Sequence, residues 1–130
     1  SMAAGEFVEV YAKAEERGSW DVVATCYFID TAKNVLRYLE VINHVLPVGG
    51  WWVNVGPLLW HFEQDRIPSV ELTLDELLSL LAHCGFELEE QRTLSPQTYT
   101  GVPHSMLTHH YVPEFWVCRK VRHHSMAPSV

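Results

Sequence analysis

The chain has few basic residues and no long apolar run. Nine Lys and Arg residues stand against sixteen Asp and Glu residues in 130 positions, which gives a formal net charge of -7. A surface that neutralises nucleic-acid phosphates needs clustered basic residues, so nucleic acid is excluded as an expected partner. A membrane-spanning helix needs about 18 or more consecutive apolar residues, and because the sequence has no such stretch we expect no membrane partner.

Cysteine is also scarce. Cys26, Cys84 and Cys118 are odd in number and widely spaced. A disulfide framework is therefore not expected, and a reducing intracellular setting fits better. No apolar leader before a cleavage site is recognisable, so secretion is not indicated. A hydrophobic content of 48% indicates one folded domain with its own core.

The first half of the sequence alternates between element types. Phe7–Tyr11 ("FVEVY") alternates apolar and polar residues, which predicts a short strand. Asp21–Phe28 is a continuous apolar run that predicts a strand covered on both faces. Apolar residues recur at helical spacing over Val35–Leu46, and Trp51–Gly56 supplies a second buried strand. Strand, helix and strand make a βαβ unit, whose two strands should be parallel.

The second half predicts one helix and two further strands. Thr73 followed by Glu76 is typical of a helix start, and Gly85 is placed to end that helix in the left-handed conformation. Phe86–Thr93 and Glu114–Val121 then read as strands. A loop without a helix joins them, so the two strands should pair antiparallel.

Ligands of parallel α/β sheets bind at the carboxyl ends of the strands. That rule selects the segments Cys26–Asp30 and Gly56–Glu63, and it predicts that Asp30 and His61 face one crevice.

Each of these residues also has a simpler interpretation. Asp30 stands near the start of a helix, where an Asp is commonly a cap, and local physics favours that role. His61 lies between aromatic residues and fits a core histidine satisfied by backbone groups. Cys26 fits a small buried apolar side chain. Tyr99 and Tyr111 fit loop anchors that act by packing alone.

Four segments in this order resemble the carnosine N-methyltransferase family of S-adenosylmethionine-dependent enzymes: "AAGEF", "WDVVATCYFIDTA", "GGWWVNVGPLLWHFE" and "QTYTGVPHSM". The resemblance covers Ser1 to Lys120. It implies an α/β fold, namely the carboxyl-terminal half of a Rossmann-like class I methyltransferase fold that ends in an antiparallel strand pair. It also implies methyl transfer from S-adenosylmethionine to an imidazole nitrogen of carnosine, which gives anserine, or of a related histidine dipeptide or peptide. No metal is needed.

The resemblance assigns roles to the acceptor side of the site. Asp30 and His61 match the pair that holds the substrate imidazole, and they are the expected catalytic residues. A carboxylate that accepts the other ring N–H fixes the tautomer and makes the attacking nitrogen more electron-rich. Tyr99 and Tyr111 match substrate-contacting tyrosines, and His109 stands where the family has a further tyrosine.

The resemblance also assigns the cofactor side. Glu6 and Phe7 match a segment that meets the adenine end of S-adenosylmethionine, with Glu6 in place of a shorter Asp. Cys26 matches a cysteine close to the bound cofactor. The glycine-rich turn and the ribose-binding acid of such folds do not occur in the sequence. We therefore expect residues 1–120 to be the carboxyl-terminal part of a methyltransferase domain that is inactive alone, and residues 121–130 to be a disordered tail.

Two other classes of function stay open. Eight histidines include His109-His110 and His123-His124, which suggests a metal-binding module, although the usual ligand spacings are missing. A non-catalytic interaction module would use an exposed sheet edge to pair with another chain, and a second copy would give a homodimer. The expected location is the cytoplasm, with the nucleus as a further candidate.

Overall fold

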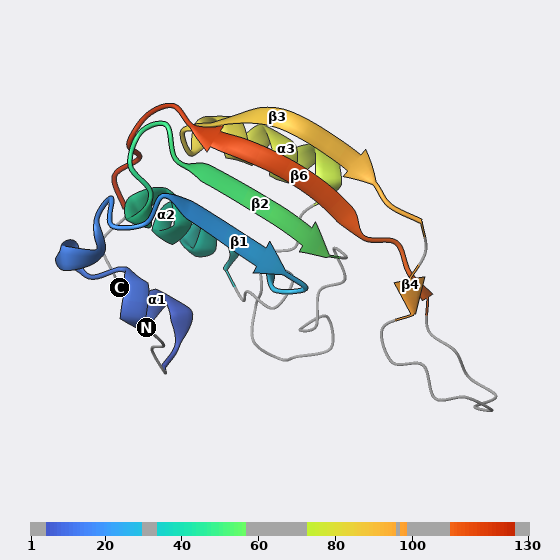
Figure 1. The fold of residues 1–130 in the computed structure, drawn as a ribbon, viewed down its shortest axis with the longest axis horizontal. Helices are drawn as coiled ribbons and strands as arrows, with labels where there is room; N and C mark the ends of the chain where they lie inside the picture. The colour runs from blue at the N-terminus through green and yellow to red at the C-terminus, as the bar shows by residue number, and fades with distance from the viewer. Residues whose placement is uncertain (1–4, 30–33, 57–72, 96, 99–109, 127–130) are drawn as a thin grey trace.

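The computed structural model describes residues 5–29, 34–56, 73–95, 97–98 and 110–126. Its main sheet has the strand order β1-β2-β6-β3 (Figure 1). These strands are β1 (Val22–Cys26), β2 (Trp51–Gly56), β6 (Glu114–Lys120) and β3 (Phe86–Thr93). Two short strands, β4 (Gln97–Thr98) and β5 (His110–Tyr111), form a separate antiparallel pair.

Two helices, α2 (Val35–Val45) and α3 (Leu74–His83), lie on the same side of this sheet (Figure 1). The hydroxyl of Thr73 accepts a hydrogen bond from the Glu76 backbone N–H at 3.2 Å, and Gly85 after α3 has a φ of 88°. Both predicted ends of α3 are therefore confirmed. None of the described helices has the length and apolar character needed to cross a membrane.

The strand pairing confirms the predicted α/β class. β1 and β2 are parallel, with Val22 opposite Trp51, so the βαβ unit is confirmed. β3 and β6 are antiparallel as predicted, but β6 also pairs with β2 and lies between the two. The sequence explains why β6 is central and β3 is at the edge. Alternate β6 side chains are buried, whereas most β3 side chains are exposed and three of the eight are acidic, which suits an edge strand.

The prediction of a strand over Phe7–Tyr11 is wrong, because these residues form helix α1. The Glu6 carboxylate caps it by accepting the Glu9 backbone N–H at 3.0 Å. The rings of Phe7 and Tyr11, one helical turn apart, lie 5.5 Å from each other. Five residues are too few to distinguish the two-residue repeat of a strand from the 3.6-residue repeat of a helix. The cap and the contact between the two rings favour the helix. A 3₁₀ turn, Ala14–Glu16, follows.

The prediction that the first apolar strand is covered on both faces is also wrong. Both helices cover the side to which Thr25 and Trp52 point, and these two side chains are buried. On the other side Val22 is 54% exposed and Trp51 is 39% exposed. β1 is an edge strand of the described sheet. Some of its apolar side chains therefore remain exposed in the described part of the chain.

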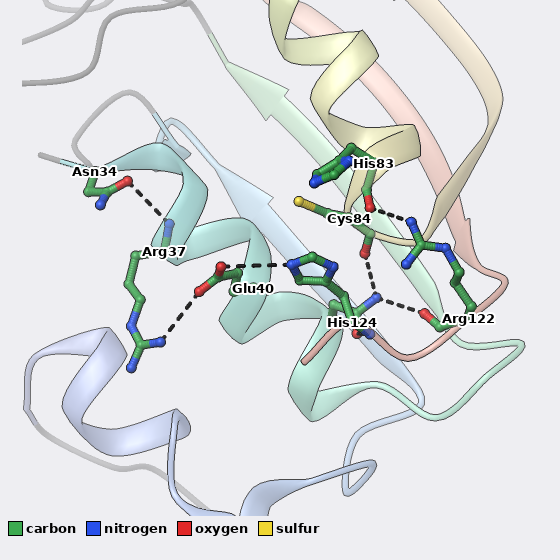
Figure 2. A network of polar contacts seen from close by, with 8 residues as sticks. Asn34, Arg37, Glu40, His83, Cys84, Arg122 and His124 are labelled. Carbon is green, nitrogen blue, oxygen red and sulfur yellow. Dashed lines mark hydrogen bonds and ion pairs between the residues drawn. The ribbon is translucent and has the colours of Figure 1, made fainter. Parts of the chain in front are cut away.

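Residues 121–126 lie against α2, although we expected them to belong to a disordered tail. The Asn43 side chain donates to the Cys84 carbonyl at 2.8 Å and to the Arg122 carbonyl at 3.0 Å, and it accepts the His124 backbone N–H at 2.9 Å. Glu40 lies between Arg37 and His124, at 3.4 and 3.8 Å (Figure 2).

Lys120 fixes the last strand to the end of α2. Its side chain is buried, and its Nζ donates to the carbonyls of Asn43 and Leu46 at 2.6 Å each. The last carbonyls of a helix have no partner within the helix, so a cation at this place both satisfies them and complements the helix dipole. Burial, followed by the nearby charge of Arg17, lowers the pKa of the Lys120 ammonium.

Replacing Lys120 with Met should lower the free energy of unfolding by about 2–3 kcal/mol, because two buried carbonyls lose a charged donor. Urea unfolding followed by tryptophan fluorescence measures this difference. Lys13→Met, at an exposed lysine, is the matched control and should change stability by less than about 0.5 kcal/mol. Equal effects of the two substitutions would contradict the role of Lys120.

Candidate functional site

The carboxyl ends of β1 and β2 are held unusually close. The Tyr27 backbone N–H donates to the Val55 carbonyl at 2.8 Å, and Tyr27 adopts a φ of 51°, which is rare for a residue with a side chain. A Cβ atom on Gly56 would lie 2.9 Å from the Tyr27 nitrogen, so only glycine fits there. Two parallel strands thus end side by side, which is where ligands of such sheets bind.

Buried polar side chains join the same two strands. The Trp52 indole N–H donates to the Thr25 hydroxyl at 2.9 Å, and that hydroxyl donates to Asn54 Oδ1 at 2.7 Å. All three side chains are buried. Buried polar groups specify a unique arrangement when they are hydrogen-bonded, so this chain of bonds fixes β1 against β2 in one register.

A cavity of about 410 Å³ runs along β1 beside α1. Its walls are mainly apolar and aromatic, and they come from α1, β1, the residues that flank β1 and the end of α2. The lining residues are Phe7, Tyr11, Trp20, Val22, Val23, Ala24, Thr25, Cys26, Phe28 and Val45. The size and apolar character are those of a small-molecule site.

Aromatic rings build the α1 wall of this cavity. The Phe7 ring meets the Phe28 ring edge-on at 5.2 Å, and it lies 5.1 Å from the Tyr38 ring. Phe28 and Tyr38 are stacked at 5.1 Å. Such pairs add to the energy of burial and hold ring orientations, so α1 is fixed to α2 through them.

Two of the three residues predicted on the cofactor side share this cavity. Phe7 and Cys26 both line it, from α1 and from the end of β1. Cys26 is exposed, so its interpretation as a buried apolar side chain is wrong. Glu6 is the N-cap of α1 and binds the Glu9 N–H through one carboxylate oxygen. The flat apolar face of an adenine ring fits a wall of this composition, with Cys26 at the strand end.

The predicted acceptor-side residues are mostly outside the described part of the chain. Asp30, His61, Tyr99 and His109 lie in segments that the structure does not describe, and Tyr111 pairs with Gln97 through β4 and β5.

The N-cap of α2 tests the alternative interpretation of Asp30 as a helix cap. It is Asn34, whose side chain accepts the Arg37 N–H at 3.4 Å. The interpretation of Asp30 as the cap of this helix is therefore wrong.

The histidines near the end of the chain point to different partners. His123 Nδ1 lies 3.3 Å from the Lys120 ammonium, whereas His124 Nε2 lies 3.8 Å from the Glu40 carboxylate. Burial, with the Lys120 charge next in importance, lowers the pKa of His123. Within the described residues, no group of three or more His, Cys, Asp or Glu side chains is arranged to hold a metal ion.

Sequence reasoning missed the polar contacts beneath the strand ends. Thr25 and Asn54 lie 29 positions apart, and their pairing depends on the strand register. One signal was present, since Asn54 is the single polar side chain in the buried run "WWVNVG". A polar residue in such a run requires a hydrogen-bond partner.

The three cysteines should differ sharply in reactivity. Burial raises the pKa of Cys84 to about 11 and that of Cys118 to about 12, and both side chains are inaccessible. At pH 8 the folded chain should therefore present one accessible thiol, Cys26, to a disulfide reagent, and three thiols should react in denaturant.

Cys26→Ser should abolish the reaction of the native chain, and Cys84→Ser is the matched control that should leave it unchanged. Two or three reactive thiols in the native chain would show that the buried placement of Cys84 and Cys118 is incorrect.

Comparison with known proteins gives the family. A model of the carnosine N-methyltransferase family matches residues 1–122. The chain is 47% identical over 129 residues to a carnosine N-methyltransferase of Schizosaccharomyces pombe, covering 92% of the chain and 34% of that protein. It is 41% identical over 121 residues to the Rattus norvegicus carnosine N-methyltransferase, covering 92% of the chain and 30% of that protein. The chain thus spans about a third of the length of these relatives.

A solved structure carries the fold comparison. A protein of Methanosarcina mazei, described as an S-adenosylmethionine-dependent methyltransferase, superimposes with a TM-score of 0.58 at 15% identity. The match covers 81% of this chain and 61% of that one. The sheet with its parallel β1–β2 pair and antiparallel end is therefore part of a class I methyltransferase fold, and the chain belongs to the carnosine N-methyltransferase family.

Proposed function

We propose that this chain is the part of an S-adenosylmethionine-dependent N-methyltransferase that holds the adenine end of the cofactor and the imidazole of the acceptor. The acceptor is carnosine, which gives anserine, or a related histidine-containing dipeptide or peptide. One observation carries the proposal: the cavity lined by Phe7 and Cys26 lies at the strand pair whose carboxyl ends lead into the segments with Asp30 and His61. The names of the relatives support the substrate class.

The cofactor, when bound, supplies a methyl group on a sulfonium, which reacts by in-line displacement. The protein must therefore align one imidazole nitrogen and keep competing water away. The Phe7 ring and the apolar side chains of β1 offer contact to an adenine ring. The Cys26 thiol, at the end of β1, is placed to contact the cofactor beyond that ring.

The acceptor side rests on Asp30 and His61. A carboxylate at Asp30 accepts the N–H of the ring nitrogen that does not react, so the other nitrogen presents its lone pair. As the methyl group is transferred the ring becomes cationic, and a nearby carboxylate stabilises that charge. His61 orients the ring or takes the proton that leaves. Tyr99, His109 and Tyr111 contact the rest of the dipeptide.

Asp30→Asn and His61→Ala should each lower kcat/KM for carnosine by about 10–100-fold, because an orienting partner of the imidazole is lost. The assay follows transfer of a labelled methyl group in the full-length protein.

Asp21→Asn and His83→Ala change the same residue types at exposed positions and serve as controls. Wild-type rates for both Asp30→Asn and His61→Ala would contradict the proposed contacts to the imidazole.

S-adenosylhomocysteine should protect Cys26 from thiol reagents, because the cavity that exposes the thiol would be filled. We expect labelling of Cys26 in the full-length protein to slow by about 10-fold at 10 times the dissociation constant, as simple occupancy requires. Phe7→Ala should weaken this protection, whereas Phe115→Ala, in β6 away from the cavity, should not. Undiminished labelling under saturating ligand would place the cofactor elsewhere.

One observation favours a second role, in protein interaction. The sheet face opposite α2 and α3 carries the exposed apolar residues Val22 and Trp51, and β1 has an unpaired edge among the described residues. Apolar faces of this kind are contact surfaces. Sedimentation velocity of the 130-residue chain distinguishes the cases, since a monodisperse monomer at tens of micromolar argues against self-association through this face.

A further inference from the structure

Residues 121–126 follow β6 and lie back against the end of α2 and the turn at Gly85 (Figure 1). The Val121 backbone N–H donates to the Gly85 carbonyl at 2.9 Å, and the Met126 side chain packs against the core. We call these six residues the 121–126 segment. Few contacts hold it, so the protonation state of a side chain within it can decide whether it stays bound.

The Lys120 ammonium has a full set of acceptors only while this segment is bound. An ammonium carries three protons. Two are donated to the carbonyls of Asn43 and Leu46, and His123 Nδ1 lies 3.3 Å from the same nitrogen. Because an ammonium only donates, Nδ1 must accept, which requires a neutral imidazole with its proton on Nε2. The contact therefore exists in one protonation state of His123.

Groups that are cationic, or become so on protonation, face the His123 ring from every side. They are Lys120 at the end of β6, Arg17 after the 3₁₀ turn, His44 on α2 and His124 in the segment itself. A protonated His123 would lose its acceptor role and lie 3.3 Å from a second cation. Burial, and after it the Lys120 charge, accordingly lowers the pKa of His123 from its ordinary value of 6.5.

The neighbouring histidine has the opposite surroundings. His124 Nε2 lies 3.8 Å from the buried Glu40 carboxylate (Figure 2), and the His124 backbone N–H donates to Asn43 Oδ1 at 2.9 Å. The His83 ring meets the His124 ring edge-on at 5.8 Å. Protonation of His124 would strengthen its contact with Glu40, whereas protonation of His123 breaks the contact with Lys120. The two adjacent histidines therefore respond to acid in opposite directions.

We propose that the 121–126 segment is a proton-sensitive switch, bound to α2 while His123 is neutral and released when His123 takes up a proton. This conformational device is separate from the proposed catalysis. The sign follows from linkage: a released His123 binds a proton more tightly than a bound one. Binding of the segment is therefore strongest above pH 6.5, and it is lost as the pH falls through the lowered pKa of His123.

Hydrogen exchange of the complete 130-residue chain, read by mass spectrometry and corrected for intrinsic rates, tests the switch at pH 7.5 and 5.5. The backbone N–H groups of Val121 and His124 report on the segment, because both donate hydrogen bonds across it. Their exchange should be about 10-fold faster at pH 5.5, since two like charges then lie side by side. Exchange within β6 should not change, because its pairing with β2 and β3 remains.

Two matched variants separate the histidines. His123→Asn places a carbonyl oxygen near the position of Nδ1 and cannot take up a proton, so the segment should stay protected at both pH values. His124→Asn makes the same change one residue along, and the segment should still be released at pH 5.5 because His123 is retained. Equal release in wild type and His123→Asn would contradict the proposal, and so would a segment that exchanges freely at pH 7.5.

The titration of His123 itself gives a measurement that does not depend on how a variant folds. In spectra of histidine-labelled wild-type chain, the His123 ring should titrate below pH 6.5, at the pH where the segment loses protection. A His123 ring that titrates at or above 6.5, or a segment still protected when this ring is protonated, would overturn the proposal.

Discussion

The hydrogen bond between Thr25 and Asn54 joins the two parallel strands on which the candidate site depends. It is buried, it is supported by the Trp52 indole, and it fixes the register of β1 against β2. Where these strands end, Gly56 allows the chain at Tyr27 to approach within a distance that no other residue permits. The cavity and the strand ends are therefore positioned by one small set of contacts.

Local patterns were sufficient to predict the elements whose ends carry strong signals. The helix α3, the strand β3 and the βαβ unit follow from caps, glycine and periodicity, and the structure confirms them. The pattern failed at Phe7–Tyr11, because five residues are too few to separate a strand period from a helix period. It also failed for the cover of β1, since apolar composition alone does not say what packs on each face.

The sequence predicted some residues of the candidate site but not others. Phe7 and Cys26 came from the family resemblance and lie on one cavity, while Glu6 is also the cap of α1. Asp30 and His61 remain predictions, because they lie outside the described residues. Asn54 was missed, since its importance arises from its hydrogen bond to Thr25 on the neighbouring strand. Long-range register is set by tertiary packing, which a local pattern does not contain.

The central claim is that the cavity along β1 holds the adenine end of the cofactor, and that the segments after β1 and β2 hold the imidazole of the acceptor. A crystal structure of the full-length protein with S-adenosylhomocysteine and carnosine tests it directly. The account predicts adenine against Phe7 and Cys26, and the imidazole between Asp30 and His61. Adenine outside this cavity, or an imidazole that contacts neither residue, would contradict it.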